Sequence, residues 1–156
     1  MLLALLLSSM LGQRIAHRAH EAAGSSGAHL DCSAFVRHIY AGEGVELTGS
    51  VRDIHAQATR RHALRKRPRP GDLVFFRHTT GKDGFTHVGI VERVRGNEVY
   101  FVHRASRGVV RSRLDLRHPR SRKSNDFIRR ASHGRGPKLA GECAAGFASP
   151  DLLRRS

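Results

Sequence analysis

The first half of the chain carries apolar positions at helical spacing. Residues 14–23 (RIAHRAHEAA) predict a short helix, which GSSGAH at 24–29 ends. A second helix is predicted from Cys32 to about Ala41, with Asp31 as its N-cap, because aspartate is among the side chains that cap helices best. The apolar face of this helix is formed by Phe35, Val36, Ile39 and Tyr40.

A third helix is predicted over residues 50–64, with Ser50 as its cap, and the pattern then changes. A basic link with two prolines, RKRPRPGD at 65–72, follows this helix. The later segments are short, β-branched and aromatic, which is typical of strands. The predicted strands are 72–76, 86–94, 98–106 and 108–116, with 126–130 as a candidate for the last one.

Helices followed by an antiparallel meander predict an α+β fold, with helices packed against the sheet. A chain of 156 residues suits one domain with one core. We expect an apolar leader at 1–13, a folded domain at 14–131 and a basic Gly/Ala/Arg-rich tail at 132–156. The tail has no hydrophobic period, so we expect it to be poorly ordered.

The leader, MLLALLLSSMLGQ, resembles the apolar region of a secretory signal peptide. It is too short to span a bilayer, so no stable membrane span is expected. The other interpretation is an apolar start to a helix, because the leader lacks the Lys or Arg that normally precedes such a region. We favour export, and we expect a secreted or periplasmic protein of the cell envelope.

Lysine and arginine total 28 against 13 acidic residues, which gives a formal net charge of +15. Such a surface attracts polyanions, whether nucleic acid, anionic lipid or an acidic cell-wall polymer. Aromatic residues make up only 6% of the chain, which disfavours a protein that stacks single-stranded bases. Charge alone does not choose among these polyanions.

The two cysteines, Cys32 and Cys143, are too few for a disulfide scaffold and do not form a C-x-x-C pair. A bridge between them would silence Cys32 as a nucleophile, so we expect free thiols. The 11 histidines are scattered and form no His/Cys cluster with metal-ligand spacing. No metal site is therefore expected.

Cys32 lies at the predicted start of a helix, in the stretch DCSAFV. The unpaired N–H groups and the positive dipole end of a helix N-terminus favour a thiolate and can hold an oxyanion. Ser33 and Ala34 are small and leave the approach to the thiol open, whereas the charge of Asp31 alone raises the thiol pKa. The alternative is a small buried thiol near a helix start.

A general base for this thiol is expected on the strands, where His87 opens HVGIV and His103 lies inside YFVHRAS. A turn at Gly96 and Asn97 would bring the two strands side by side. With a strict two-residue turn, Ile90 pairs with His103 and the two imidazoles lie on opposite faces. Sharing one face requires a bulge or an odd-length loop.

Gly89 follows His87 by two residues and shares its face of the strand. A residue without a side chain leaves open space beside the imidazole, which predicts part of a substrate groove. The alternative is that Gly89 marks a bulge and that His87 only begins a strand.

Four motifs in this order, DCSAFV, RPGDLVFF, THVGIVERV and VYFVHRAS, resemble the NlpC-type papain-like cysteine peptidases of bacterial cell walls. The resemblance covers roughly residues 30–116, and the four motifs together are far more specific than any one of them. It implies a papain-like catalytic domain, in which the helix that carries the nucleophile packs on an antiparallel sheet. It implies no metal or organic cofactor. With the basic surface, it also implies binding to anionic cell-wall polymers rather than to specific nucleic acid, and we expect a monomer.

The resemblance also implies the chemistry. Cys32 is the expected nucleophile, His87 the general base and His103 the residue that orients His87. The expected substrate is the peptide stem of peptidoglycan, cut at the amide between D-glutamate and diaminopimelate. The residues expected to line the oxyanion and substrate site are Asp31, Ser33 and Gly89.

Other functions stay open. A related CHAP-type N-acetylmuramoyl-L-alanine amidase would suit HVGIVE, although DCS favours the NlpC type. An inactive papain-like module could use the basic surface to bind cell wall or nucleic acid, but the presence of Cys32, His87 and His103 argues against this. A nucleic-acid binder would ignore Cys32 and would lose its affinity as salt rises.

Overall fold

The computed structural model describes the backbone of residues 2–129 and 135–154, and the side chains in these ranges from residue 10 onward. Three helices come first, and strands follow. The helices are α1 (Leu2–Ala22), α2 (Cys32–Ala41) and α3 (Val51–Arg60). The strands of the main sheet are β1 (Leu64–Arg65), β2 (Leu73–Arg77), β3 (Phe85–Arg95), β4 (Glu98–Ala105), β5 (Gly108–Asp115) and β8 (Ala144–Ala148).

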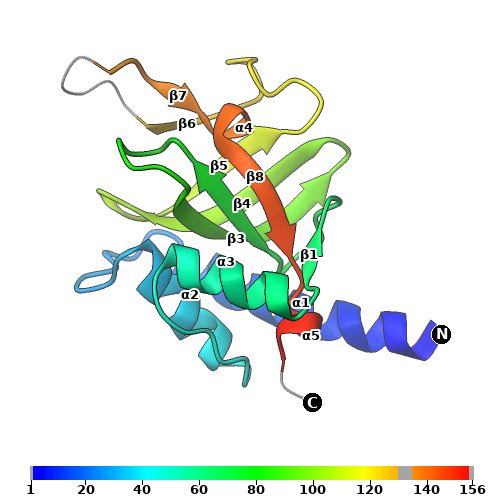
Figure 1. Ribbon diagram of the computed structural model, residues 1–156. Coiled ribbons are helices and arrows are strands. Elements are labelled where there is room, and N and C mark those ends of the chain that lie inside the picture. The colour runs from blue at the N-terminus through cyan, green and yellow to red at the C-terminus, as the bar shows by residue number, and fades with distance from the viewer. Residues whose placement is uncertain (1, 130–134, 155–156) are drawn as a thin grey trace.

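The main sheet has six strands in the order β1-β8-β2-β3-β4-β5, and every neighbouring pair is antiparallel. Helices α1, α2 and α3 cover one face (Figure 1). The other face is covered by a smaller layer, made of β6 (Phe127–Arg129), β7 (Lys138–Leu139) and α4 (Ala140–Cys143). The predicted α+β class, with helices packed on an antiparallel sheet, is confirmed.

Alternate residues of the sheet enter two separate cores, as the pleat of a strand requires. In β2, Leu73 and Phe75 pack with the helices, whereas Val74 and Phe76 pack in the opposite cluster. All four are completely buried, so β2 is covered on both faces.

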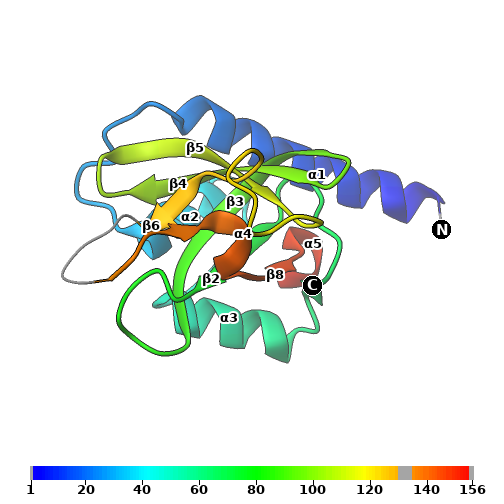
Figure 2. The ribbon, with the colours of Figure 1, turned by 90° about the horizontal axis from the view of Figure 1, so that it is seen from above.

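Helix α1 is longer than the predicted segment 14–23, because no residue between Leu2 and Ala22 breaks it. Gly12 lies inside this helix, where a Cβ atom would come within 2.4 Å of the Pro70 carbonyl oxygen. The glycine therefore lets α1 lie directly against the turn before β2. Seen from above, α1 and α3 lie toward opposite edges of the sheet, and the N-terminal end of α1 extends beyond the strands (Figure 2).

Helices α2 and α3 begin where their caps were predicted. α2 has the predicted bounds, and its residues Phe35, Val36, Ile39 and Tyr40 are buried. α3 begins after Ser50, which forms a capping box with Asp53. It ends earlier than predicted because the chain turns at Arg61 and enters β1.

The expectation of a poorly ordered tail at 132–156 is corrected for residues 135–154. These residues form β7, α4, β8 and a last helix, α5 (Pro150–Leu153). β8 lies between β1 and β2, pairing Ala148 with both Leu64 and Leu73. Leu139, Phe147 and Leu153 are buried, so apolar side chains scattered among small residues anchor this segment.

None of the described helices has the length and apolar character needed to cross a membrane. The export role predicted for residues 1–13 stays a prediction.

Candidate active site

Asp31 caps α2 and so determines where Cys32 stands at the helix start. The Asp31 backbone is extended, and its Oδ1 accepts a hydrogen bond of 2.7 Å from the Ala34 N–H. This bond, followed by the bond from the Ser33 hydroxyl, lowers the pKa of the Asp31 carboxyl. The aspartate is therefore ionised at neutral pH, and its charge is spread over the cap as the sequence suggested.

The Ser33 side chain belongs to the same cap. Ser33 is buried, and its Oγ donates a hydrogen bond of 2.9 Å to Asp31 Oδ1. Arg37 Nη1 in turn donates to Ser33 Oγ at 3.3 Å. The hydroxyl therefore makes its hydrogen bonds within α2 and its cap. The role of Asp31 and Ser33 in lining a substrate stays a prediction.

The Cys32 thiol is partly buried beside the helix-side core. Burial raises its pKa above the ordinary value, and the charge of Asp31 raises it further. Hydrogen bonds from the backbone amides of Val88, Ser33 and Cys32 lower the pKa, but they do not outweigh burial. The expectation that the helix start favours a thiolate is therefore corrected for the free protein, in which the neutral thiol dominates at neutral pH.

The hydrogen bond from the Val88 amide ties the thiol to β3. Val88 directly follows His87, so the thiol meets the strand next in sequence to the expected base. Two elements far apart in the sequence, the start of α2 and the first half of β3, meet here.

His87 and His103 lie on the same face of the sheet, and a bulge is the reason. Arg95 pairs with Glu98 across a two-residue turn, but the register shifts at Glu92, so that Ile90 pairs with Val102 instead of His103. The extra residue moves His103 into line with the His87 face. The sequence predicted that sharing a face would need such a bulge, and the bulge is present.

The two imidazoles are hydrogen-bonded to each other. His87 Nε2 lies 2.8 Å from His103 Nδ1, and the rings are nearly perpendicular, at 86°. Burial lowers the pKa of both histidines, and for His103 the neighbouring His87 lowers it further. Both rings are therefore neutral at neutral pH. Since His87 uses Nε2 toward His103, its Nδ1 is the ring nitrogen left outside this hydrogen bond.

Aromatic rings hold this pair in place. The ring of Phe76 lies 5.8 Å from that of His87, and the ring of Phe101 lies 4.8 Å from that of His103. Phe76 and Phe101 contact each other at 5.0 Å. These side chains are completely buried, so the imidazoles stand on a rigid, apolar support.

Gly89 does not provide the open space that was expected. It is buried, and a Cβ atom there would lie 3.1 Å from both the Cβ of His103 and the carbonyl oxygen of Val102. The glycine instead allows β4 and its histidine to approach β3 closely. The groove expected at this position is filled by His103.

Sequence reasoning missed Ser112. Its Oγ lies 2.9 Å from His103 Nε2, on the side of the ring opposite His87. Ser112 is a polar residue at an inward position of an alternating strand, between Val110 and Leu114. That interruption of the apolar side was the available signal.

Two open depressions are lined by close sequence neighbours of the site residues, Ala34 in one and Thr86 in the other, but not by Cys32, His87 or His103. One, of about 540 Å³, lies along α2 and includes Ala34, Arg37 and His38. The other, of about 700 Å³, lies between the start of α3 and the loop before β3, and includes Arg52, Lys82 and Thr86. Both contain cations, which suits a substrate that carries carboxylates.

The remaining candidate groups are separate from this site. Cys143 is free and buried in the core on the other face of the sheet from the helices. Among the described residues, no three His, Cys, Asp or Glu side chains are grouped in a way that could hold a metal ion.

A family model described as the NlpC/P60 family matches residues 17–127. The matched segment includes α2, the β3–β4 hairpin and β5, and therefore Cys32, His87, His103 and Ser112. No curated protein matches the chain.

Proposed function

Because this chain belongs to the NlpC/P60 family, whose members are cysteine peptidase-type hydrolases that act on the cell wall, we propose that it cuts amide bonds in the peptide stems of peptidoglycan. The bond we propose joins D-glutamate, through its γ-carboxyl, to diaminopimelate. Cys32 is the proposed nucleophile, His87 the base and His103 its orienting partner. The observation that carries this proposal is the thiol at the first turn of α2, bonded to the residue that follows His87.

The acylation step follows from this geometry. The thiol proton of Cys32 passes to His87 Nδ1 as the sulfur attacks the amide carbon. The charge that develops on the carbonyl oxygen is held by backbone N–H groups at the start of α2, the Cys32 amide first among them. When the C–N bond breaks, His87 gives its proton to the leaving amine, and a thioester to Cys32 remains.

The deacylation step uses the same groups in reverse. His87 Nδ1 removes a proton from water, whose oxygen attacks the thioester carbon. The C–S bond breaks, the sulfur of Cys32 takes back a proton, and the carboxylic acid leaves. His103 holds the His87 ring in the orientation that both steps require. The sum is amide plus water to acid plus amine.

The raised thiol pKa and the lowered imidazole pKa fit this sequence. In the free protein, the proton rests on sulfur and His87 is neutral, so the base is ready to accept it. Proton transfer then accompanies attack on a bound substrate, and no stable thiolate is needed beforehand.

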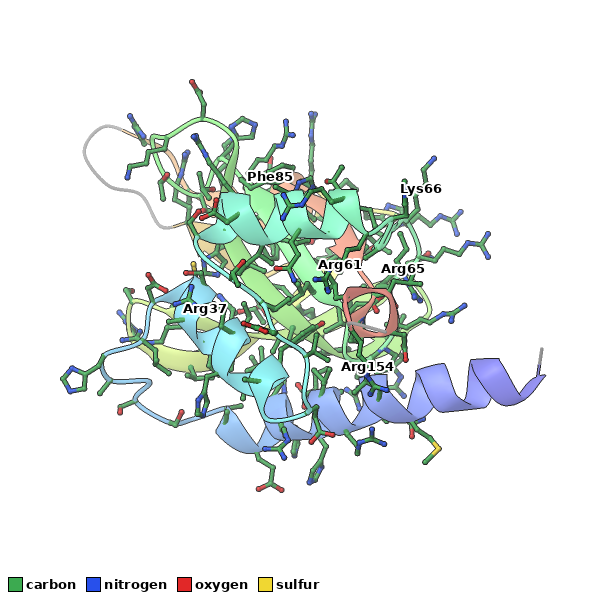
Figure 3. The ribbon with its side chains drawn as sticks, turned by 60° about the horizontal axis from the view of Figure 1, so that its bottom comes forward. Arg37, Arg61, Arg65, Lys66, Phe85 and Arg154 are labelled. Carbon is green, nitrogen blue, oxygen red and sulfur yellow. The ribbon has the colours of Figure 1, made fainter. Side chains whose placement is uncertain are left out.

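We propose that the anionic polymer of the wall is also the partner of the basic surface. Figure 3 labels Arg61, Arg65, Lys66 and Arg154 around the end of α3, β1 and α5. Arg65 is paired with the buried Asp72, at 3.7 Å, whereas Lys66 and Arg154 are exposed. With a net charge of +15, this surface favours polyanions at low ionic strength. We further propose that the protein acts as a monomer outside the cytoplasm, where its substrate is located.

The test is a digest of purified diaminopimelate-type peptidoglycan, with mass spectrometry of the soluble products. We expect the wild type to release stem-peptide fragments that end at D-glutamate or begin at diaminopimelate, and Cys32→Ala to release none. A matched control is Cys143→Ala, which removes the thiol far from the site and should cut normally.

Other outcomes would overturn particular parts. Fragments that begin with the intact L-alanine amine, released from the glycan, would identify a muramoyl-alanine amidase and exclude the bond proposed here. If no variant cuts but all sediment with the wall, the protein is a binding module. If sedimentation does not decrease as salt is raised, the basic surface does not recognise the polymer by charge.

A further inference from the structure

We propose that Ser112 is a positioning residue, which fixes the tautomer of His103 and through it the orientation of His87. The inference rests on the proposed function of Cys32 and His87. Ser112 touches neither the thiol nor the expected substrate, and acts only through His103.

The contact is short, buried and unambiguous in its partners. His103 Nε2 and Ser112 Oγ are 2.9 Å apart, with 3% of His103 and 8% of Ser112 exposed. The two residues come from neighbouring strands, since β4 and β5 pair Phe101 with Ser112 and His103 with Val110. They therefore stand on one face at a diagonal, a spacing that long side chains bridge.

Together with His87, these contacts form a row of three side chains. His87 Nε2 bonds His103 Nδ1 at 2.8 Å, and the other ring nitrogen of His103 bonds Ser112. A neutral imidazole has one N–H and one bare nitrogen, so the role of each nitrogen constrains the next. The row has two self-consistent arrangements of protons.

Only one of these arrangements is productive. If His103 carries its proton on Nε2 and donates to Ser112, its Nδ1 accepts from His87 Nε2–H, and His87 Nδ1 is free to take the thiol proton. In the other arrangement, His103 Nδ1–H donates to His87 Nε2. His87 then carries its own proton on Nδ1 and cannot act as the base. The Ser112 hydroxyl can accept the Nε2–H that the active form requires, whereas a side chain without an oxygen leaves that N–H unpaired.

Removing the acceptor changes this balance. In Ser112→Ala, a buried Nε2–H of His103 would lose its partner, and an unpaired buried donor disfavours that tautomer. Moving the proton to Nδ1 avoids an unpaired N–H but produces the idle form of His87. Burial lowers the pKa of both rings, so a cationic His103 with protons on both nitrogens is also unfavourable.

The experiment compares Ser112→Ala with Ser112→Thr, which keeps the hydroxyl on a β-branched side chain suited to a strand. Ser149→Ala is the matched control, because Ser149 is fully buried and its Oγ has no hydrogen-bond partner within the described residues. The substrate is a synthetic L-alanyl-γ-D-glutamyl-diaminopimelate tripeptide. The tautomers of His87 and His103 are read from the ¹⁵N shifts of their ring nitrogens.

We expect Ser112→Ala to lower kcat about tenfold with little change in KM, as the loss of one buried hydrogen bond would. We expect its His103 to shift toward the Nδ1–H tautomer, and Ser112→Thr to restore both readings. Ser149→Ala should match the wild type in kcat and in tautomer.

Two results would overturn the proposal. One is an unchanged tautomer in a folded Ser112→Ala, whatever its activity, since Ser112 would then contribute only packing. The other is a shifted tautomer with wild-type kcat, which would show that the orientation does not matter. The ring-nitrogen shifts need no substrate, so they test Ser112 even if the wild type does not cut the tripeptide, an outcome that would count against the proposed function alone.

Discussion

His87 Nε2 lies 2.8 Å from His103 Nδ1, although 16 residues separate the two histidines and a simple hairpin would place them on opposite faces. The bulge at Glu92 corrects the register, and Gly89 makes room for His103 against β3. Glu92 itself is bound by His20 of α1 and by Arg111 of β5. The relationship between the two imidazoles thus depends on the backbone register at Glu92, whose side chain is bound by residues of α1 and β5.

Replacing Gly89 by alanine should disrupt this pair. The new Cβ would lie 3.1 Å from the Cβ of His103 and 3.2 Å from Cδ2 of Phe101, so β4 must move away. We expect a loss of about 1–3 kcal/mol in the free energy of unfolding, typical of overpacking, together with a large loss of kcat. Urea denaturation and the peptidoglycan digest measure these effects.

The matched control is Gly136→Ala, since a Cβ there would have no atom within 4 Å. It should change neither stability nor activity. If Gly89→Ala cuts and unfolds like the wild type, the close approach of His103 to β3 is not needed for the site.

The reactivity of Cys32 should increase with pH. Its pKa is raised by burial, so the thiolate fraction at neutral pH is smaller than that of a free cysteine and rises as pH passes the raised pKa. We expect the rate of alkylation by iodoacetamide to be low at pH 6 and to climb above pH 8. The measurement is made in Cys143→Ser, so that only one thiol reacts. A rate that is already high and flat in mild acid would indicate a preformed thiolate–imidazolium pair and contradict the expectation.

Asp72 should make the protein less stable as pH rises. It is 1% exposed, and burial raises its pKa from 3.8 to about 7. Between these values the folded state holds a proton that the unfolded state has released, so the free energy of unfolding falls as pH increases through this window. Each unit of raised pKa corresponds to about 1.4 kcal/mol at full effect.

Asp72→Asn isolates this effect, because the amide oxygen of asparagine can still accept the Arg69 N–H. We expect the stability of wild type relative to Asp72→Asn to decrease from pH 4.5 to pH 8, measured by urea denaturation at each pH. Parallel curves for the two proteins would mean that Asp72 ionises as readily in the fold as in the unfolded chain.

Phe147 should be essential for stability although it lies in a segment without hydrophobic period. It is 3% exposed and packs in the cluster with Val74 and Phe76. Phe147→Ala should lower the free energy of unfolding by about 3–5 kcal/mol. Leu152→Ala, at a side chain that is 52% exposed, should change it by less than about 0.5 kcal/mol. Equal effects of the two substitutions would show that β8 is not part of the folded core.

The pattern of apolar and polar residues was sufficient to predict the helices α2 and α3 and the central strands. Asp31 predicted the start of α2 because capping is a local interaction, readable from one side chain and the helix after it. The strands β2 to β5 were predicted within about two residues of their ends, because β-branched and aromatic residues gather there between glycine-containing turns. The candidate residues Cys32, His87 and His103 were chosen from their places at a helix start and on two of these strands and from the family resemblance, and their catalytic roles stay a prediction.

What the sequence left open depends on contacts between distant segments. The bulge at Glu92 has no local signature, since its register is fixed by packing across β3 and β4 and by partners on α1 and β5. The pKa of Cys32 depends on how deeply the start of α2 packs against β3. An argument from the helix dipole alone does not include this burial. β8 was missed because its residues are mostly small and give no hydrophobic period. Small side chains nevertheless fit between the neighbouring strands β1 and β2.

The position of β8 has a consequence for how the protein is made. β1 and β2 acquire their shared neighbour only from residues 144–148, long after the ribosome has produced both strands and the whole catalytic row. Because a pairing between segments so distant in sequence is slow to form, the sheet remains open throughout most of synthesis. The meander of β2 to β5 can pair without this segment, but β2 keeps one unpaired edge until residues 144–148 are made, so the six-stranded sheet is completed late.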